Sequence, residues 1–218
     1  MNRSWLPALA AAAGLGLVAC SGSSSPSTTA APTAQPSVAS AAPTASAGDA
    51  SAIPSQSPVA AESNPPGDIP DNLAFVPYAN TAGGYSFKHP EGWAQTESGT
   101  TVTFTDKLNG VHAEPGTATS PPTVASARRD DVPRLSRSQP AFELRSVTAV
   151  TMPGGTGVRI VYRRNSQPDA VTGRQYRDEV ERYELVSHGK EIVLELYGPV
   201  GADNVDAYRT MVQSLRIT

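Results

Sequence analysis

The sequence predicts an α+β domain built on an antiparallel β-sheet of about six to eight strands with flanking helices. Three observations favour this class. Beyond residue 67, apolar and polar residues alternate over short segments, glycine- and proline-containing turns separate these segments, and two segments have the apolar spacing of amphipathic helices. Strands joined by short turns pair antiparallel, and amphipathic helices need a sheet on which to bury their apolar side. We therefore expect one folded domain over residues 67–218.

The first twenty residues have the features of a bacterial export signal. Arg3 supplies a positive charge, and the stretch from Trp5 to Ala19 is apolar. It has the length of a signal-peptide core and is shorter than the ~20 residues of a spanning helix. Leu17-Val18-Ala19-Cys20 resembles the bacterial lipoprotein signal, in which a cysteine receives diacylglycerol before cleavage. We expect residues 1–19 to be removed and Cys20 to be lipidated; an ordinary signal peptide followed by a structural cysteine is the alternative.

Residues 20–66, which begin with the lipidated cysteine, are predicted to continue as a disordered tether. From Ser21 to Pro66 there is no aromatic residue, and the only charges are Asp49 and Glu62 among alanines, serines, threonines and prolines. Such a segment buries too little apolar surface to offset the roughly 1–2 kcal/mol per residue that backbone ordering costs. A span of about 35–40 Å would hold the domain clear of the membrane surface. The alternative is an O-glycosylated stalk.

The first part of the domain is predicted to hold strands and one helix. Alternation places the strands at residues 85–88, 101–106 and 111–113. Pro90-Glu91-Gly92 forms a turn that lets Trp93 cover one end of the sheet, and Asn109-Gly110 forms a hairpin turn because both residues tolerate positive φ. Ser120 is the predicted N-cap of a helix that Pro133 ends or kinks.

The second part is predicted to be a meander of strands followed by a closing helix. The strands cover residues 142–152, 158–162, 183–185 and 192–196. They are joined by a turn at 153–155, a long polar loop from Asn165 to Gly173 and a tight turn at His188-Gly189. Asp203 is the predicted N-cap of the last helix. Four apolar residues recur in that helix at helical spacing: Val205, Tyr208, Val212 and Leu215.

Three segments resemble the PsbP-like superfamily: Gly84–Trp93, the Val-Ala-Ser-Ala helix that begins at Val124 after two prolines, and the terminal helix at Val205–Arg209. This superfamily includes the extrinsic subunit of the photosystem II oxygen-evolving complex, a Ran-binding nuclear import factor and many bacterial lipoproteins. The resemblance covers about Tyr78 to Leu215. It implies a non-enzymatic domain that docks on a membrane-associated complex.

We predict no catalytic residue, no metal site and no cofactor. The three histidines lack a second ligand at zinc spacing: His89, His112 and His188. Asp203 and Asp206 lack the glycine and glutamate of a calcium loop, and the sequence has no Gly-x-Ser-x-Gly motif. Glu179, Glu181 and Glu184 could give a carboxylate pair for glycoside hydrolysis, but Glu179 and Glu181 alternate with Val180 and Arg182 as an exposed strand face does. The 17 Lys and Arg nearly balance the 20 Asp and Glu, which predicts no nucleic-acid partner.

The predicted partner-binding residues are Trp93 and four arginines that flank the long polar loop: Arg163, Arg164, Arg174 and Arg177. If the arginines gather at one end of the sheet, they can face an acidic lipid or an acidic protein. The alternative is that each pairs with Asp169, Asp178 or a neighbouring glutamate.

Together these features indicate a bacterial lipoprotein, anchored by its lipid on the extracytoplasmic face of the cell membrane, that binds an envelope or membrane protein complex without catalysis. Two alternatives remain open. One is a solute-binding protein associated with a transporter, although one lobe offers no cleft between lobes. The other is an envelope hydrolase, although no nucleophile–base pair is predicted.

Overall fold

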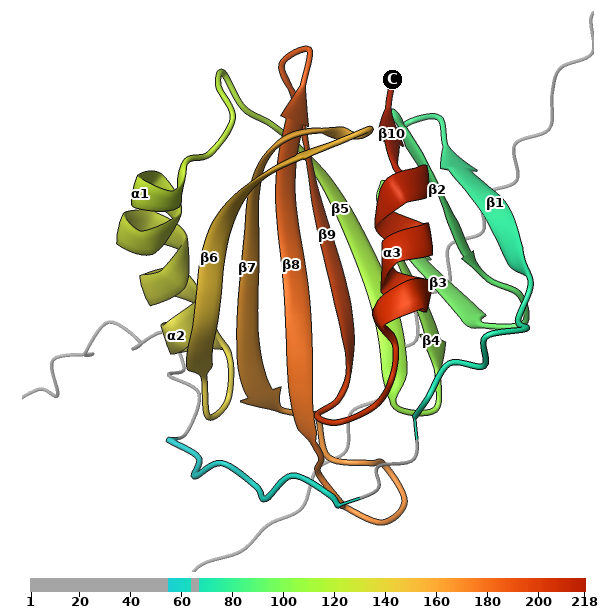
Figure 1. Ribbon diagram of the computed structural model, residues 1–218, viewed down its shortest axis with the longest axis vertical. Coiled ribbons are helices and arrows are strands. Elements are labelled where there is room, and N and C mark those ends of the chain that lie inside the picture. Colours follow the sequence, from blue (N-terminus) through green and yellow to red (C-terminus); the bar gives the residue numbers. More distant parts are fainter. Residues whose placement is uncertain (1–54, 64–66) are drawn as a thin grey trace, which may run out of the picture. The chain divides into compact units, whose positions relative to one another are not determined.

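The computed structural model describes residues 55–63 and 67–218 (Figure 1). The predicted signal segment, Cys20 and most of the predicted tether lie outside these residues. The described strands form two antiparallel sheets, one of seven strands in the order β3-β4-β5-β9-β8-β7-β6 and one of three strands in the order β1-β2-β10. The predicted α+β class is confirmed, and the sequence did not predict that the strands divide into two sheets.

The strands of the seven-stranded sheet are β3 (Ala94–Ser98), β4 (Thr101–Asp106), β5 (Asn109–Thr117), β6 (Glu143–Met152), β7 (Gly155–Asn165), β8 (Arg177–Ser187) and β9 (Lys190–Pro199). The two longest, β7 and β8, have 11 residues each and pair as far as Asn165 and Arg177. The tight turn predicted at His188-Gly189 joins β8 to β9, and both of its residues have positive φ. The predicted meander is therefore confirmed.

One face of this sheet is covered by the smaller sheet and the last helix. The covering elements are β1 (Phe75–Asn80), β2 (Tyr85–Pro90), α3 (Val205–Ser214) and β10 (Arg216–Ile217). Figure 1 shows α3 running beside β2. Phe87 of β2 and Met211 of α3 share one buried cluster with Leu194 of β9. This cluster is the larger of the two apolar cores, and it contains the side chains that the alternation of β4, β8 and β9 predicted to point inward.

The opposite face is covered by a helical segment made of α1 (Val124–Ser126), a π-helical turn η1 (Ala127–Asp131) and α2 (Val132–Ser138). Ala127 and Leu135 pack there with Val158, Ile160 and Val180 of the sheet. The segment lies over β6, β7 and β8, so the part of this face formed by β3, β4 and β5 has no helix over it (Figure 1).

The start of the helical segment differs from the prediction, and of the two outcomes predicted for Pro133 the helix end is not observed. Thr123, not Ser120, is the N-cap, and it exchanges reciprocal hydrogen bonds with Ser126. Pro133 does not end the helix but lies in the first turn of α2. A proline has no N–H and its ring crowds the preceding turn, and the wider π-helical turn directly before Pro133 provides the extra room.

The hairpin turn predicted at Asn109-Gly110 lies two residues earlier, at Lys107-Leu108, where Lys107 has a φ of 50°. Asn109 and Gly110 instead begin β5 and are buried. A Cβ atom on Gly110 would come within 2.2 Å of the Tyr197 ring, so the glycine is required by packing between β5 and β9.

The N-cap predicted at Asp203 is wrong by one residue, because Asn204 occupies the cap position of α3. Its side chain does not cap the helix. The Asn204 Oδ1 atom accepts a hydrogen bond from the Ile69 N–H at 2.8 Å, and its Nδ2 atom donates to Asn109 Oδ1 at 2.9 Å. Asn204 thus ties the entering chain to β5. Val205, predicted to face the core, is 62% exposed.

These contacts predict that Asn204→Ala destabilises the domain by about 1–3 kcal/mol, because the substitution removes the acceptor of the Ile69 N–H and the side-chain donor to Asn109 Oδ1. Asp203→Ala, at the exposed neighbouring position, is the matched control and should change the free energy of unfolding by less than about 0.5 kcal/mol. Urea denaturation of both variants measures the difference. A larger loss for Asp203→Ala would support the cap that the sequence predicted.

Candidate functional site

The predicted arginines do lie near one end of the seven-stranded sheet, where β7 passes through the loop of residues 166–176 into β8. Arg163 and Arg164 are adjacent in β7, so their side chains point to opposite faces of the sheet. Arg174 lies in the loop, and Arg177 begins β8. The four do not form one exposed basic patch.

Two of these arginines are engaged by partners across the strands. Arg163 Nε donates to Glu179 Oε2 at 3.0 Å. Arg164 donates to the Gln139 side chain at 2.9 Å, lies 3.8 Å from the Asp178 carboxylate and sits over the Tyr197 ring. The alternative interpretation, in which each arginine pairs with an acidic neighbour, describes both.

Arg177 is 5% exposed and has a structural role. Its guanidinium donates to the Ala141 carbonyl at 2.8 Å, to Glu143 Oε2 at 2.9 Å and to Asn165 Oδ1 at 3.4 Å. It joins the start of β8 to the segment entering β6. A partner protein therefore has little access to Arg177 itself.

Trp93, the fifth predicted partner-binding residue, is 7% exposed and belongs to the larger core. The turn at residues 91–92, in which Gly92 has a φ of 82°, directs the indole inward as the sequence predicted. The same burial removes Trp93 from the docking surface, because a side chain that fills the core has no area left for a partner.

Part of the predicted tether contacts the domain at the arginine end. We call residues 55–63 the tether segment. Its Val59 N–H donates to Asn165 Oδ1 at 3.0 Å, and Asn165 Nδ2 donates to the Ser57 carbonyl at 2.9 Å. Arg174 forms an ion pair with Glu62, so the acidic group that faces this arginine comes from the chain itself. The predicted boundary at residue 67 therefore falls after the first contacts with the domain.

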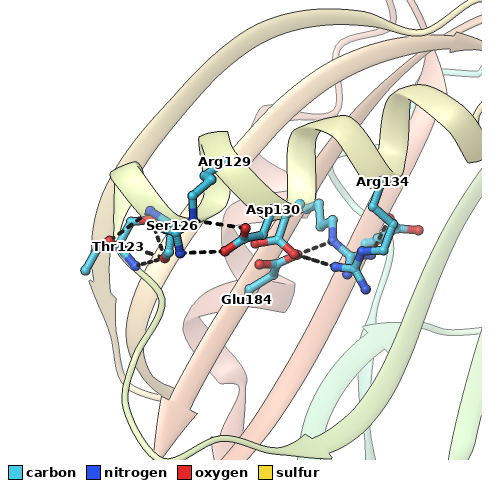
Figure 2. A network of polar contacts seen from close by, with 9 residues as sticks. Thr123, Ser126, Arg129, Asp130, Arg134 and Glu184 are labelled. Atoms are coloured by element: carbon cyan, nitrogen blue, oxygen red, sulfur yellow. Dashed lines mark hydrogen bonds and ion pairs between the residues drawn. The ribbon is translucent and has the colours of Figure 1, made fainter.

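A second polar site is a groove between the helical segment and strands β5, β8 and β9. Its volume is about 530 Å³, and most of its lining residues are charged, among them Glu114, Asp131, Arg134, Arg182, Glu184 and Glu191. Figure 2 shows Glu184 facing the helix below Asp130, with Arg134 to its right and the reciprocal contacts of Thr123 and Ser126 at the helix start. The groove lies at the border between the covered and uncovered parts of this face.

Arg182 is the centre of the buried charges under the groove. Its Nε atom donates to Glu184 Oε1 at 2.6 Å and one terminal nitrogen donates to Glu195 Oε1 at 2.8 Å. The Tyr162 hydroxyl donates to the same Glu195 oxygen at 3.0 Å. Burial alone would raise the pKa of Glu195, but Arg182 and its other partners outweigh burial, and the pKa is lowered.

Glu184 and Glu191 are the carboxyl groups of the groove whose protonation is most favoured. Burial raises the pKa of Glu184 even though Arg182 opposes the shift, and burial likewise raises the pKa of Glu191. Both residues neighbour Asp131, whose negative charge adds to the effect. The groove therefore carries more acidic than basic side chains, five against three, and is suited to binding charged groups.

Among residues 55–63 and 67–218, no three or more His, Cys, Asp and Glu side chains are arranged to hold a metal ion. Each histidine has a local contact. His89 stacks on Phe104 in the core, His112 is hydrogen-bonded to Thr103, and His188 lies in the β8–β9 turn. Within the same described residues, no helix combines the length and the apolar character needed to cross a membrane.

The sequence did not single out Asn165 or Arg182 as site residues, and it raised Glu184 only as a possible catalytic carboxylate. The spacing of Arg182 and Glu184, two residues apart in a strand, places them on one face, and this is the signal that was available. For Asn165 no signal existed, because its partners in the tether segment are more than 100 residues away in the chain.

Neither a protein-family model nor a curated protein matches this chain. Among solved structures, it is similar to PsbP of the cyanobacterium Synechocystis, with a TM-score of 0.46 and 18% identity over 67% of this chain and 94% of the other. It is similar to the Ran-binding protein Mog1p of Saccharomyces cerevisiae, with a TM-score of 0.44 and 9% identity over 67% of this chain and 96% of the other.

A third similar structure is LpqN, described as involved in cell envelope biogenesis of Mycobacterium tuberculosis. It has a TM-score of 0.42 and 16% identity over 68% of this chain and 92% of the other. PsbP and a Ran-binding protein are also kinds of protein named by the sequence resemblance.

Asp178, beside Arg164, gives the arginine end a pH dependence. Burial raises the pKa of Asp178 to about 7, although Arg164 and Arg177 lower it. The stability contributed by the protonated carboxyl is fully present below pH 3.8, the ordinary pKa of the group, and is lost as the pH rises through about 7.

We therefore expect Asp178→Asn to gain stability relative to the wild type between pH 4 and pH 7, by about 1–3 kcal/mol in total. Urea denaturation at several pH values measures this difference. A difference between the two proteins that does not change with pH would contradict the raised pKa.

Proposed function

We propose that this protein is a lipid-anchored lipoprotein of the bacterial cell envelope whose extracytoplasmic domain binds a membrane or envelope protein without catalysing a reaction. The observation that carries the anchor is Leu17-Val18-Ala19-Cys20 at the end of an apolar segment, followed at once by serines and glycine. Two or three acyl chains on one cysteine hold a protein on a membrane much more firmly than a single chain does.

The charged groups of the groove support binding rather than catalysis. Arg182 donates to Glu184 Oε1 at 2.6 Å and to Glu195 Oε1 at 2.8 Å, so the arginine is committed to these two carboxyl groups. The alternating charges along the rim, with Asp130 and Asp131 beside Arg134 and Arg137, suit a complementary protein surface.

A solute-binding role is the second candidate, and the size of the groove favours it. A volume of about 530 Å³ falls within the range of small-molecule sites. Such sites are predominantly apolar, whereas this groove is lined mainly by charged residues. A polar solute that raises the melting temperature of the wild type but not of Glu184→Gln would establish this role and replace the proposal of a protein partner.

The anchor predicts that Cys20→Ala abolishes lipidation, because only a thiol forms the thioether to diacylglycerol. Cells that express the wild type or the variant are fed an alkyne fatty acid, and the label on each protein is measured. The wild type should be labelled and Cys20→Ala should not. Cys20→Ser is the matched control for size and should also lose the label. Undiminished labelling of either variant would refute the anchor.

The groove predicts where a protein partner is captured in intact cells. A photo-crosslinking amino acid at Glu114, inside the groove, should yield one discrete cross-linked product. The same amino acid at Lys107, an exposed residue in the β4–β5 turn, is the control and should yield none. Arg137→Glu should reduce the product from position 114 several-fold, whereas Arg209→Glu on α3 should not. Equal products from positions 114 and 107 would show that the groove is not the docking surface.

A further inference from the structure

The carboxamide of Asn165 uses its full hydrogen-bonding capacity, and the tether segment supplies most of the partners. Oδ1 accepts from the Val59 N–H at 3.0 Å and from Arg177 at 3.4 Å. Nδ2 donates to the Ser57 carbonyl at 2.9 Å and to Gln56 Oε1 at 3.3 Å. A carboxamide has two donor hydrogens and two acceptor positions, so all four are engaged.

This arrangement recognises a peptide backbone rather than particular side chains. In an extended chain, the carbonyl of one residue and the N–H two residues later point to the same side. The Asn165 side chain takes up such a pair from Ser57 and Val59, as a neighbouring strand would. Pro58 lies between them and is exposed, and its missing N–H is not needed there. A proline at this position also favours the extended conformation that the contact requires.

The domain holds the recognising group in place without help from the tether segment. The Asn165 N–H donates to the Pro140 carbonyl at 2.9 Å, and Ser166 and Tyr176 are hydrogen-bonded directly beyond it. Arg177, itself fixed by Ala141 and Glu143, donates to Asn165 Oδ1 and sets the orientation of the carboxamide. The site is therefore preorganised, which lowers the free-energy cost of binding.

Two further side chains extend the site along the segment. Gln175 Nε2 lies 3.4 Å from Gln56 Oε1 on one side of the asparagine contact. On the other side, Arg174 pairs with Glu62 and lies over the Tyr176 ring, with its centre 4.7 Å from the ring centroid. We call Asn165, Arg174, Gln175 and Arg177 the clamp. It spans an extended stretch with a proline in the middle and a carboxylate four residues after that proline.

The tether segment is held loosely enough to be displaced. Of its nine residues only Val59 and Glu62 are partly buried, and the rest are exposed. Its attachment consists of a few polar contacts, and exposed ion pairs of the Arg174–Glu62 kind contribute about 0–1 kcal/mol.

We propose that the clamp is a peptide-binding site for an extended, acidic, proline-containing segment of a partner protein, and that the tether segment is its built-in competitor. The backbone contacts of Asn165 define the extended conformation, and Arg174 selects a carboxylate. This inference goes beyond the proposed function, because it concerns a different surface from the groove and does not depend on the lipid anchor.

Competition from the tether segment lowers the apparent affinity of the clamp for an external peptide. A ligand joined to its site by a short flexible linker acts at an effective concentration in the millimolar range. An external peptide of the same sequence therefore binds the intact chain weakly. It binds much better once the tether segment can no longer occupy the clamp.

The test measures the fluorescence anisotropy of a labelled peptide with the sequence of residues 56–62. It is added to the intact chain and to a full-length variant in which residues 56–62 are replaced by glycine and serine. The variant should bind the peptide at least tenfold more tightly than the intact chain. In the variant, Asn165→Ala should weaken binding at least tenfold, and thermal melts establish that the protein remains folded.

A charge exchange keeps the test decisive if Asn165→Ala does not fold. In the glycine–serine variant, Arg174→Glu should weaken binding of the natural peptide several-fold, and a peptide with Glu62→Lys should restore it. Arg209→Glu on α3 is the matched control and should have no effect.

Two outcomes would overturn the proposal. One is that the glycine–serine variant does not bind the peptide, since the contacts of the tether segment would then depend on chain connectivity. Equal binding after Asn165→Ala and Arg174→Glu would also overturn the proposal, because the peptide would then bind somewhere other than the clamp. The other is that the intact chain dimerises with rising concentration and that Asn165→Ala abolishes the dimer. The occupant would then be the tether segment of a second copy rather than a partner protein.

Discussion

Both faces of the seven-stranded sheet have to be covered, and the way each is covered decides where the polar sites of the domain lie. On one face, apolar side chains such as Leu194 run across the central strands, and the smaller sheet and α3 bury them. On the other face, the apolar residues are concentrated on β6, β7 and β8. One helical segment is enough to cover these strands, and its edge leaves the groove beside β5 and β9.

The groove is lined by charges because the side chains of the strands beneath it change from apolar to charged at this border. Ile160 and Tyr162 face the helices, whereas Arg182 of β8 lines the groove and pairs with Glu195 of β9 beneath it. Breaking a buried ion pair by removing one partner is more costly than the pair is stabilising. Arg182 and its two glutamates therefore restrict how the helical segment can sit on the sheet, and the pairing of Arg134 with Asp131 and Glu184 adds to this restriction.

The alternation of apolar residues, as at Val158, Ile160 and Tyr162, predicted seven strands because it reports directly on burial, but it did not predict β1, β3 or β10. The prediction from sequence failed where a residue packs against, or is hydrogen-bonded to, a distant part of the chain. Asn109-Gly110 has the composition of a hairpin turn, but the glycine is needed for the approach of Tyr197. Asn204 stands at a helix start, yet it is hydrogen-bonded to residues 135 and 95 positions away. Local sequence patterns carry no information about such distant partners. The contacts of Asn165 with the tether segment are a further example.

The clamp also changes what the tether does. The composition of the tether segment predicts disorder, since it offers almost no apolar surface to bury. The domain nevertheless orders it with a preformed carboxamide and an arginine, which act on the backbone and on one carboxylate. A polar segment of this kind remains exchangeable, because no buried side chain has to be withdrawn from a core when it leaves.

Amide hydrogen exchange at Val59 in the intact chain tests this account most directly. The Val59 N–H is held by Asn165 Oδ1 at 3.0 Å in the clamp. The account predicts that this amide exchanges at least tenfold more slowly than that of Ala61 and that Asn165→Ala removes the difference. Exchange at Val59 as fast as at Ala61 in the wild type would contradict it.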